Sequence, residues 1–173
     1  TEPAFYLPDE AVKYFRQAVG AGEKQETSLN ELFKKYQQDY PELADELTSS
    51  ELPVGWDADL PVFKQEQDGA MATRAASGKV LNALAKKLPL LVGVSADLAP
   101  SNKTYLTGLG DIGSQPAQGE ERNLHFGVRE HAMASMCNGM ALHGGVIPFC
   151  ATFLVFHDYM RPAVRLASLM KLP

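Results

Sequence analysis

The stretch Leu124-His125-Phe126-Gly127-Val128-Arg129-Glu130-His131-Ala132-Met133 decides how the second half of this chain folds. An apolar, strand-like run from Leu124 to Gly127 leads into a helical pattern from Arg129 to Leu142, which Gly144-Gly145 ends. The sequence therefore places one carboxylate, Glu130, in the first turn of a helix that follows a strand. A carboxylate there gains ~0.3–1 kcal/mol from the helix dipole, so its position alone does not require a ligand.

Around this stretch, helices and strands alternate along the chain. Ala72-Thr73 begins a helix, and Leu90 to Ser95 is a short apolar run typical of a strand buried on both faces. Val146 to Cys150 is a further strand, and Thr152 begins a helix through Met170 that Pro162 should kink. This order predicts an α/β fold, in which part of a mostly parallel sheet is flanked by helices. Three strands leave an exposed edge, so we expect missing elements or a partner chain to cover it.

The first part of the chain, residues 1–69, reads as short helices followed by a connector from Ser49 to Asp68. Its expected helices begin at Pro8-Asp9-Glu10, at the capping box Ser28-Leu29-Asn30-Glu31, and at Pro41, and the first is expected to end at Gly20 and Gly22. A boundary near residue 70 therefore separates a helical linker, 1–69, from the alternating region, 70–173.

Composition narrows the possible functions. With 173 residues, 45% of them hydrophobic and 21% charged, the chain is globular and not disordered. Its net charge of −5, without a basic stripe, argues against nucleic-acid binding. No apolar run approaches the ~20 residues that span a bilayer, so no membrane association is expected, and an intracellular location is the default. Cys137 and Cys150 lack C-x-x-C spacing, which argues against a disulfide framework or a zinc site.

Three segments share one place in the predicted sheet, because each begins at the carboxyl end of a strand, where such sheets bind ligands. They are Ser95-Ala96-Asp97, Gly127 to Glu130, and Ala151 to Phe153. Together they suggest a half-site for a flat heteroaromatic cofactor. Phe153, Phe156 and Tyr159 follow at helical spacing, although such a stripe is more often core than cofactor box. The four histidines show no ligand spacing, and no metal ligand is predicted within the chain.

Four motifs resemble those of transketolases, and they occur in the same order. They are Ala72-Thr73-Arg74, Ser95-Ala96-Asp97-Leu98-Ala99-Pro100-Ser101-Asn102, Phe126-Gly127-Val128-Arg129-Glu130-His131-Ala132-Met133, and Ala151-Thr152-Phe153-Leu154-Val155-Phe156. By this resemblance, residues 1–69 are the end of the diphosphate-binding domain and its linker. Residues 70–173 are the first half of a pyrimidine-binding domain. The Gly-Asp-Gly…Asn motif that holds metal and diphosphate in such enzymes is not in this sequence.

The resemblance implies transfer of a two-carbon ketol unit between phosphosugars, with thiamine diphosphate as cofactor. Glu130 would be the catalytic residue, sharing a proton with ring nitrogen N1′ of the aminopyrimidine. Arg74 and Ser101 would bind the sugar phosphate, for which a forked guanidinium and a hydroxyl are suited. The cofactor-binding residues implied are Asp97, Leu98, Glu130, Phe153, Phe156 and Tyr159.

The resemblance also implies properties of a complete enzyme that would contain this chain. The resemblance implies a divalent cation, Mg²⁺ or Ca²⁺, held by the diphosphate-binding domain, and a homodimer in the pentose phosphate pathway of the cytoplasm, or of the plastid in a plant. The chain alone is expected to be inactive. Two alternatives stay open: an enzyme similar to dihydroxyacetone synthase, and a non-catalytic binding or assembly piece. Val94 departs from the family, which usually has a second glycine after Gly93.

Overall fold

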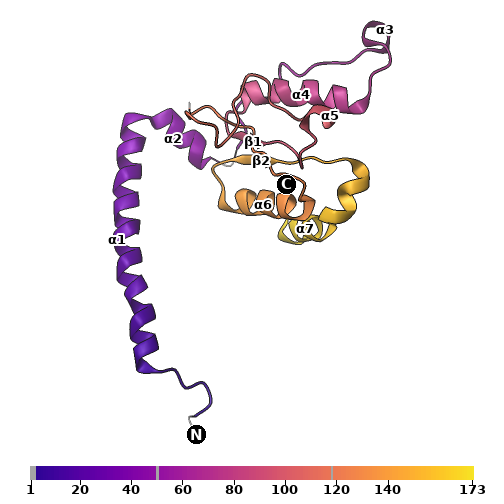
Figure 1. Ribbon diagram of the computed structural model, residues 1–173. Helices are drawn as coiled ribbons and strands as arrows, with labels where there is room; N and C mark the ends of the chain where they lie inside the picture. The colour runs from indigo at the N-terminus through magenta and orange to yellow at the C-terminus, as the bar shows by residue number, and fades with distance from the viewer. Residues whose placement is uncertain (1–2, 50, 118) are drawn as a thin grey trace. The chain divides into compact units, whose positions relative to one another are not determined.

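The computed structural model describes residues 3–49, 51–117 and 119–173, in two compact units, Thr1–Glu46 and Leu47–Pro173. Ser50, within the predicted connector, lies outside the described residues. The second unit carries all of the predicted site residues (Figure 1). The candidate site is therefore described within this unit.

The first unit is dominated by one long helix, α1, Asp9–Asp39. The sequence prediction that Gly20 and Gly22 end a first helix, and that Ser28 to Glu31 caps a second, is therefore wrong. Neither glycine has a positive φ, so neither adopts the left-handed conformation that usually ends a helix. Each costs the helix about 1 kcal/mol relative to alanine, which the surrounding Ala, Glu, Lys and Gln residues tolerate. The helix ends before Pro41, because a residue that precedes proline disfavours helical backbone.

Two short helices follow α1. The helix predicted to begin at Pro41 is confirmed as α2, Pro41–Thr48. Within the predicted connector, α3 spans Gln65–Asp68, and the Asp68 carboxylate accepts a hydrogen bond from the Lys64 amide at 2.8 Å. This bond satisfies one of the free amides at the start of α3.

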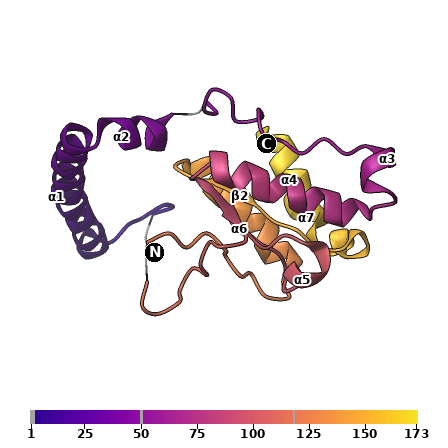
Figure 2. The same cartoon turned by 90° about the horizontal axis from the view of Figure 1, so that it is seen from above.

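The second unit is layered, with helices on both sides of a small sheet. Helix α4, Thr73–Lys87, lies on one side of strands β1, Leu91–Gly93, and β2, Ile147–Phe149. Helices α6, Glu130–His143, and α7, His157–Met170, lie on the other (Figures 1 and 2). This arrangement confirms part of the predicted α/β fold: the described chain is mostly helical, with two parallel strands instead of three.

Strand β1 pairs with β2 in parallel, in the register Leu91 with Ile147 and Gly93 with Phe149. All three residues of β1 are buried, as the apolar run predicts. Pro148 lies in β2, which has no second strand partner in the part of the chain that the structure describes. A proline lacks the amide that a central strand must donate, so its presence is consistent with an edge strand.

The predicted strand from Leu124 to Gly127 is wrong in extent. Only Asn123 pairs with β1, through an isolated parallel bridge to Gly93. The Gly93 amide donates to Arg122 O at 3.1 Å, and the Leu124 amide donates to Gly93 O at 3.1 Å. Gly127 then adopts a φ of 71° and turns the chain into α6, so the segment is too short to form a strand.

The end of the chain also differs from the single predicted helix. A 3-10 turn, Leu154–Phe156, precedes α7, and Thr152 makes no capping hydrogen bond within the described residues. Pro162 lies inside α7, which continues through it. The Asn138 side-chain amide donates to Ala163 O at 2.9 Å and ties α6 to α7 next to the proline.

The core of the second unit consists of two apolar clusters. One joins α4 to the sheet through Ala85, Leu88, Leu91 and Leu106. The other joins the sheet to α6 through Ala96, Phe126 and Met133, with Cys137, Cys150 and Met160 packed against it. Met133 is fully buried, one turn after Glu130. The second cluster therefore fixes the start of α6 against the strand ends.

One buried side chain, Asn123, holds the loop that precedes α6. Its Oδ1 accepts from the Leu106 amide at 2.8 Å, and its Nδ2 donates to Leu106 O, Leu109 O and Gly110 O. The neighbouring Arg122 guanidinium donates to Ala85 O and Leu88 O at the end of α4. Partial burial of Arg122 lowers its pKa by desolvation. We call the Asn123 hydrogen bonds to Leu106, Leu109 and Gly110 the Asn123 clamp. The sequence analysis did not predict it, because no local sequence pattern indicates it.

We expect Asn123→Ala to lower the free energy of unfolding by about 2–4 kcal/mol, because it leaves a buried amide and several carbonyls without partners. Urea unfolding followed by circular dichroism measures the loss. Asn30→Ala, on an exposed part of α1, is the matched control. Equal stability of the two variants would show that the clamp does not support the fold.

Candidate functional site

The ends of the two strands meet at one edge of the second unit. The Ala96 amide donates a hydrogen bond to Ala151 O at 3.1 Å, which joins the segment after β1 to the segment after β2. The Phe126 side chain, which packs with Ala96 and Met133, brings in the turn before α6. All three segments that the sequence singled out therefore gather at the predicted carboxyl edge of the sheet.

Glu130 is the first residue of α6 and is 9% exposed. The Met133 amide, one turn later, bonds to Arg129 O, and the turn into the helix is closed by a 2.8 Å bond from the Arg129 amide to Gly127 O. Among the described residues, no group donates a hydrogen bond or forms an ion pair with the Glu130 carboxylate. The residue is largely buried, yet its carboxylate oxygens are not among the fully enclosed atoms without partners, so they remain reachable and can accept a hydrogen bond from a ligand.

The segment after β1 forms a tight turn with unusual backbone. The Leu98 amide donates to Ser95 Oγ at 3.0 Å, and Ser95 is fully buried. Asp97 lies at the top of this turn with a φ of 61°, in the left-handed region, and its side chain is exposed. Non-glycine residues in that region store strain and often lie at functional sites. Ser95, which sequence reasoning did not assign, is the residue that holds Asp97 and Leu98 in place.

The fully buried Val94 precedes this turn and does not have a positive φ. Its backbone therefore does not require the glycine that the family usually has there. Gly93 is different, because a Cβ atom added to it would lie 1.9 Å from Phe149 O. The close approach of β1 and β2 thus depends on the first glycine and not on the second.

The predicted aromatic residues form a row after β2. The rings of Phe153 and Phe156 stack at a centroid distance of 6.2 Å with 27° between their planes. The Phe156 and Tyr159 rings are 6.3 Å apart. Phe153 and Phe156 are partly buried and Tyr159 is 65% exposed. The row is thus not enclosed by the described residues and can pack against a flat ring system.

Arg74 and Ser101 lie on two neighbouring helices, α4 and α5, the latter spanning Ala99–Asn102. Both side chains are exposed. A groove of about 370 Å³ is lined by residues of both helices, but not by Arg74 or Ser101 themselves. Its lining includes Ala75 and Pro100, the chain neighbours of Arg74 and Ser101, and it carries Lys79 and Lys103. The groove is therefore positively charged and is open to an anionic group.

Two buried polar atoms near the strand ends lack hydrogen-bond partners within the described residues, Asn102 Nδ2 and Thr152 Oγ1. Asn102 ends α5, and Thr152 lies directly before Phe153. Such atoms are rare in folded proteins and usually bond to water or to another group, so each is free to accept or donate a further hydrogen bond. Sequence reasoning did not single out either atom for binding.

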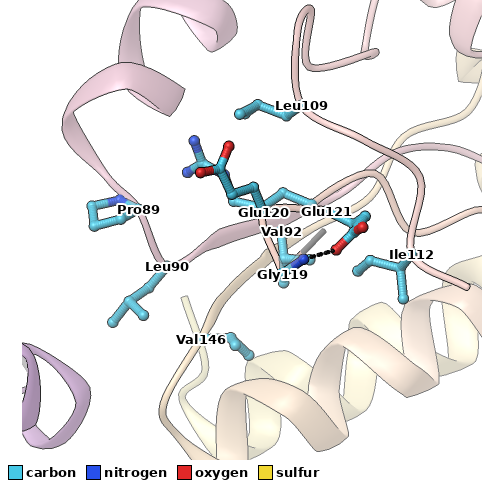
Figure 3. Close-up of a pocket in the computed structure, with 10 residues that line it drawn as sticks. Pro89, Leu90, Val92, Leu109, Ile112, Gly119, Glu120, Glu121 and Val146 are labelled. Atoms are coloured by element: carbon cyan, nitrogen blue, oxygen red, sulfur yellow. Dashed lines mark hydrogen bonds between the residues drawn. The ribbon is translucent and has the colours of Figure 1, made fainter. Parts of the chain in front are cut away.

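Two further features lie away from these residues. A cavity of about 540 Å³ is lined by Leu90, Val92 and Val146, near the starts of the strands, and by Glu120 and Glu121 (Figure 3). None of the predicted site residues lines it. Separately, Asp111 accepts hydrogen bonds from His125 Nε2 at 2.8 Å and Tyr105 Oη at 3.0 Å. These bonds lower the pKa of Asp111 and raise that of Tyr105. His125 thus takes part in a surface cluster with Asp111 and Tyr105.

Comparison with known proteins decides the family. Residues 69–173 match the family described as "Transketolase, pyrimidine binding domain". The chain belongs to the transketolase family. Members of this family use thiamine diphosphate. The family resemblance predicted from the four motifs is therefore confirmed.

Individual transketolases are similar to this chain in sequence and in structure. The chain is 51% identical to the transketolase of Bacillus subtilis over 176 residues, covering 99% of this chain and 26% of that protein. It is 50% identical to a chloroplastic transketolase of Craterostigma plantagineum, covering 95% of this chain and 32% of that protein. A structure of Pichia stipitis transketolase with sedoheptulose-7-phosphate has a TM-score of 0.76 at 38% identity, covering 99% of this chain and 26% of that one.

The chain thus spans about a quarter to a third of the length of these relatives. Across residues 3–49, 51–117 and 119–173, no group of three His, Cys, Asp or Glu side chains is placed to hold a metal ion. No helix within the same residues is long and apolar enough to cross a membrane. The groups present, an unpartnered buried carboxylate and a row of aromatic rings, fit the aminopyrimidine end of thiamine diphosphate.

Proposed function

We propose that this chain supplies the aminopyrimidine half of a transketolase active site, which transfers a two-carbon ketol unit between phosphosugars. The observation that carries the proposal is Glu130, a buried carboxylate at the start of α6 without a partner among the described residues. The family match and the aromatic row support it. In this proposal, residues 1–69 are the end of the diphosphate-binding domain and its linker, and residues 70–173 are the first half of the pyrimidine-binding domain.

Thiamine diphosphate, when bound, supplies a carbon nucleophile at C2 of its thiazolium ring. The task of Glu130 is to hold a proton at ring nitrogen N1′ of the aminopyrimidine, for which its low exposure is favourable, because water competes little for that proton. Phe153 and Phe156 pack against the ring, and Tyr159 borders it. Asp97 and Leu98, on the turn that Ser95 holds, face the cofactor and orient the sugar.

The phosphate of the sugar is bound at the groove between α4 and α5. The guanidinium of Arg74 can donate two parallel hydrogen bonds to phosphate oxygens, and the Ser101 hydroxyl can donate one. Lys79 and Lys103 add positive charge nearby. The relatives from Pichia stipitis include structures with sedoheptulose-7-phosphate and with xylulose-5-phosphate, which are sugars of this class.

The remaining half of the site, in this proposal, comes from outside the chain. A diphosphate-binding domain holds the Mg²⁺ or Ca²⁺ ion and the diphosphate, and the active enzyme is a homodimer. We expect the purified 173-residue chain to show no ketol transfer from xylulose 5-phosphate to ribose 5-phosphate with cofactor and Mg²⁺. A full-length transketolase polypeptide that contains the chain is expected to be active. Turnover by the chain alone would contradict the half-site, and transfer to formaldehyde in preference to ribose 5-phosphate would indicate a dihydroxyacetone synthase.

We expect Arg74→Lys in such a full-length polypeptide to raise the KM for the phosphosugar roughly tenfold with little change in kcat. Lysine keeps the positive charge but lacks the planar guanidinium that donates hydrogen bonds to two phosphate oxygens. Because the phosphate is bound equally in the ground and transition states, the loss affects KM and not kcat. Steady-state kinetics measures the change, with Arg16→Lys on α1 as control. A reduced kcat at an unchanged KM would remove Arg74 from phosphate binding.

A further inference from the structure

Both cysteines of the chain lie together behind the proposed half-site. Cys137 is on α6, two helical turns after Glu130, and Cys150 directly follows β2. The two side chains pack against the same buried cluster, which consists of Ala96, Phe126 and Met133. Two consecutive elements, α6 and β2, thus bring two thiols to one place in the core.

The two thiols lie against the same cluster and influence each other unequally. A hydrogen bond between them raises the pKa of Cys137, with burial adding to the effect. The same bond lowers the pKa of Cys150, although burial opposes this. The thiol of Cys137 therefore acts as the donor and the sulfur of Cys150 as the acceptor, which favours the thiolate form at Cys150.

We propose that Cys137 and Cys150 form an oxidisable dithiol, which a hydroperoxide converts to an intramolecular disulfide between α6 and the end of β2. Both are free cysteines in this structure, so the pair is in its reduced form. The sequence prediction argued against a structural disulfide framework on spacing, and it could not see this contact, which only the fold creates.

The chemistry balances with hydrogen peroxide as the oxidant. The Cys150 thiolate attacks one peroxide oxygen and breaks the O–O bond, which gives a sulfenic acid at Cys150 and, after protonation, one water molecule. The Cys137 sulfur then attacks the Cys150 sulfur, its proton leaves with the hydroxyl as a second water, and the S–S bond forms. Two thiols lose two electrons in total, and one peroxide gains them.

The disulfide would act on the segments that carry the half-site. It links α6, which begins at Glu130, to the segment that leads through Thr152 into the Phe153 and Phe156 pair. Formation of the bond requires the two Cβ atoms to lie about 3.5–4.5 Å apart, so it fixes these segments relative to one another. The dithiol is independent of the proposed ketol transfer, since neither sulfur takes part in that reaction.

The test uses a full-length polypeptide that contains this chain, treated with hydrogen peroxide, alkylated with iodoacetamide and digested with trypsin. No Lys or Arg lies between Arg129 and Arg161, and Pro162 protects the bond after Arg161, so both cysteines fall in one peptide, residues 130–165. We expect this peptide to be unalkylated and lighter by two hydrogen atoms, and dithiothreitol to restore alkylation of both cysteines. Methionine oxidation is distinguished because it adds oxygen and is not reversed by dithiothreitol.

Two single variants test the pair. In Cys137→Ser, the sulfenic acid at Cys150 should persist and be trapped by dimedone. In Cys150→Ser, peroxide should produce no dithiothreitol-reversible loss of two hydrogen atoms from the peptide, because Cys137 has no second sulfur there. Full alkylation of both cysteines in the unchanged protein after peroxide, or pairing of either with a cysteine elsewhere, would overturn the proposal. None of these outcomes depends on ketol transfer activity.

Discussion

Glu130→Gln in a full-length transketolase polypeptide that contains this chain is expected to reduce kcat for ketol transfer by about two to four orders of magnitude. Glutamine fills the same space at the start of α6 but cannot hold an ionisable proton at the ring nitrogen. Because the carboxylate has no partner among the described residues, its loss breaks no internal hydrogen bond or ion pair. The fold should therefore persist, with a free energy of unfolding lower by at most about 1 kcal/mol, because the charge interaction with the helix dipole is lost.

The matched control is Glu120→Gln, an exposed carboxylate beside the cavity at the other end of the strands (Figure 3). We expect its kcat and KM to match those of the unchanged enzyme. Steady-state rates with xylulose 5-phosphate and ribose 5-phosphate measure both variants. Near-normal turnover by Glu130→Gln would exclude Glu130 from catalysis, even if the family assignment stands.

Gly93→Ala is expected to be the most destabilising single change in the second unit, by about 3–5 kcal/mol. A Cβ atom at this position would lie 1.9 Å from Phe149 O, and the backbone φ of 154° is one that side chains rarely adopt. Gly93 is paired on one side with Phe149 and on the other with Asn123, so its backbone cannot move without breaking a pairing. The strand ends that carry the site would separate, and cofactor affinity would fall with stability.

Gly139→Ala is the control for this change, because a Cβ atom at Gly139, in the middle of α6, has no atom within 4 Å. Alanine there should stabilise the protein by up to about 1 kcal/mol, through better helix propensity. Thermal unfolding of the two variants in the full-length polypeptide gives the comparison. If Gly93→Ala unfolds at the same temperature as the unchanged protein, the close pairing of β1 with its neighbours is wrong.

The parts of the fold that sequence patterns predicted are those in which local and tertiary preferences agree. The continuous apolar run at β1 is buried as expected, and the helix from Glu130 to His143 ends at Gly144 as the sequence predicts. The prediction that glycines would end the first helix was wrong. A glycine usually ends a helix by adopting a left-handed conformation, and the local sequence does not show whether it does so. The predicted strand at Leu124 failed because its pairing depends on Gly93, far away in the chain.

The sequence predicted which residues form the candidate site, which stays a prediction, but it did not predict the contacts that support them. Motif resemblance named Glu130 and the aromatic row, and topology placed them at one edge of the sheet. The Asn123 clamp, the bond from the Leu98 amide to Ser95 Oγ, and the contact of Cys137 with Cys150 were not foreseen. The Asn123 bonds join groups 13 to 17 residues apart, so no local pattern could predict them, whereas the Ser95 bond is a local turn contact that the motif did not single out.

The central claim is that Glu130 acts on the cofactor ring, and proton exchange at the cofactor tests it most directly. The measurement is the rate at which protein-bound thiamine diphosphate exchanges its C2 proton for deuterium, followed by NMR after acid quenching. It is made with the unchanged full-length polypeptide and with Glu130→Gln, at cofactor concentrations that saturate both. The account predicts exchange at least about 100-fold slower in Glu130→Gln. Equal exchange rates in the two proteins would contradict it.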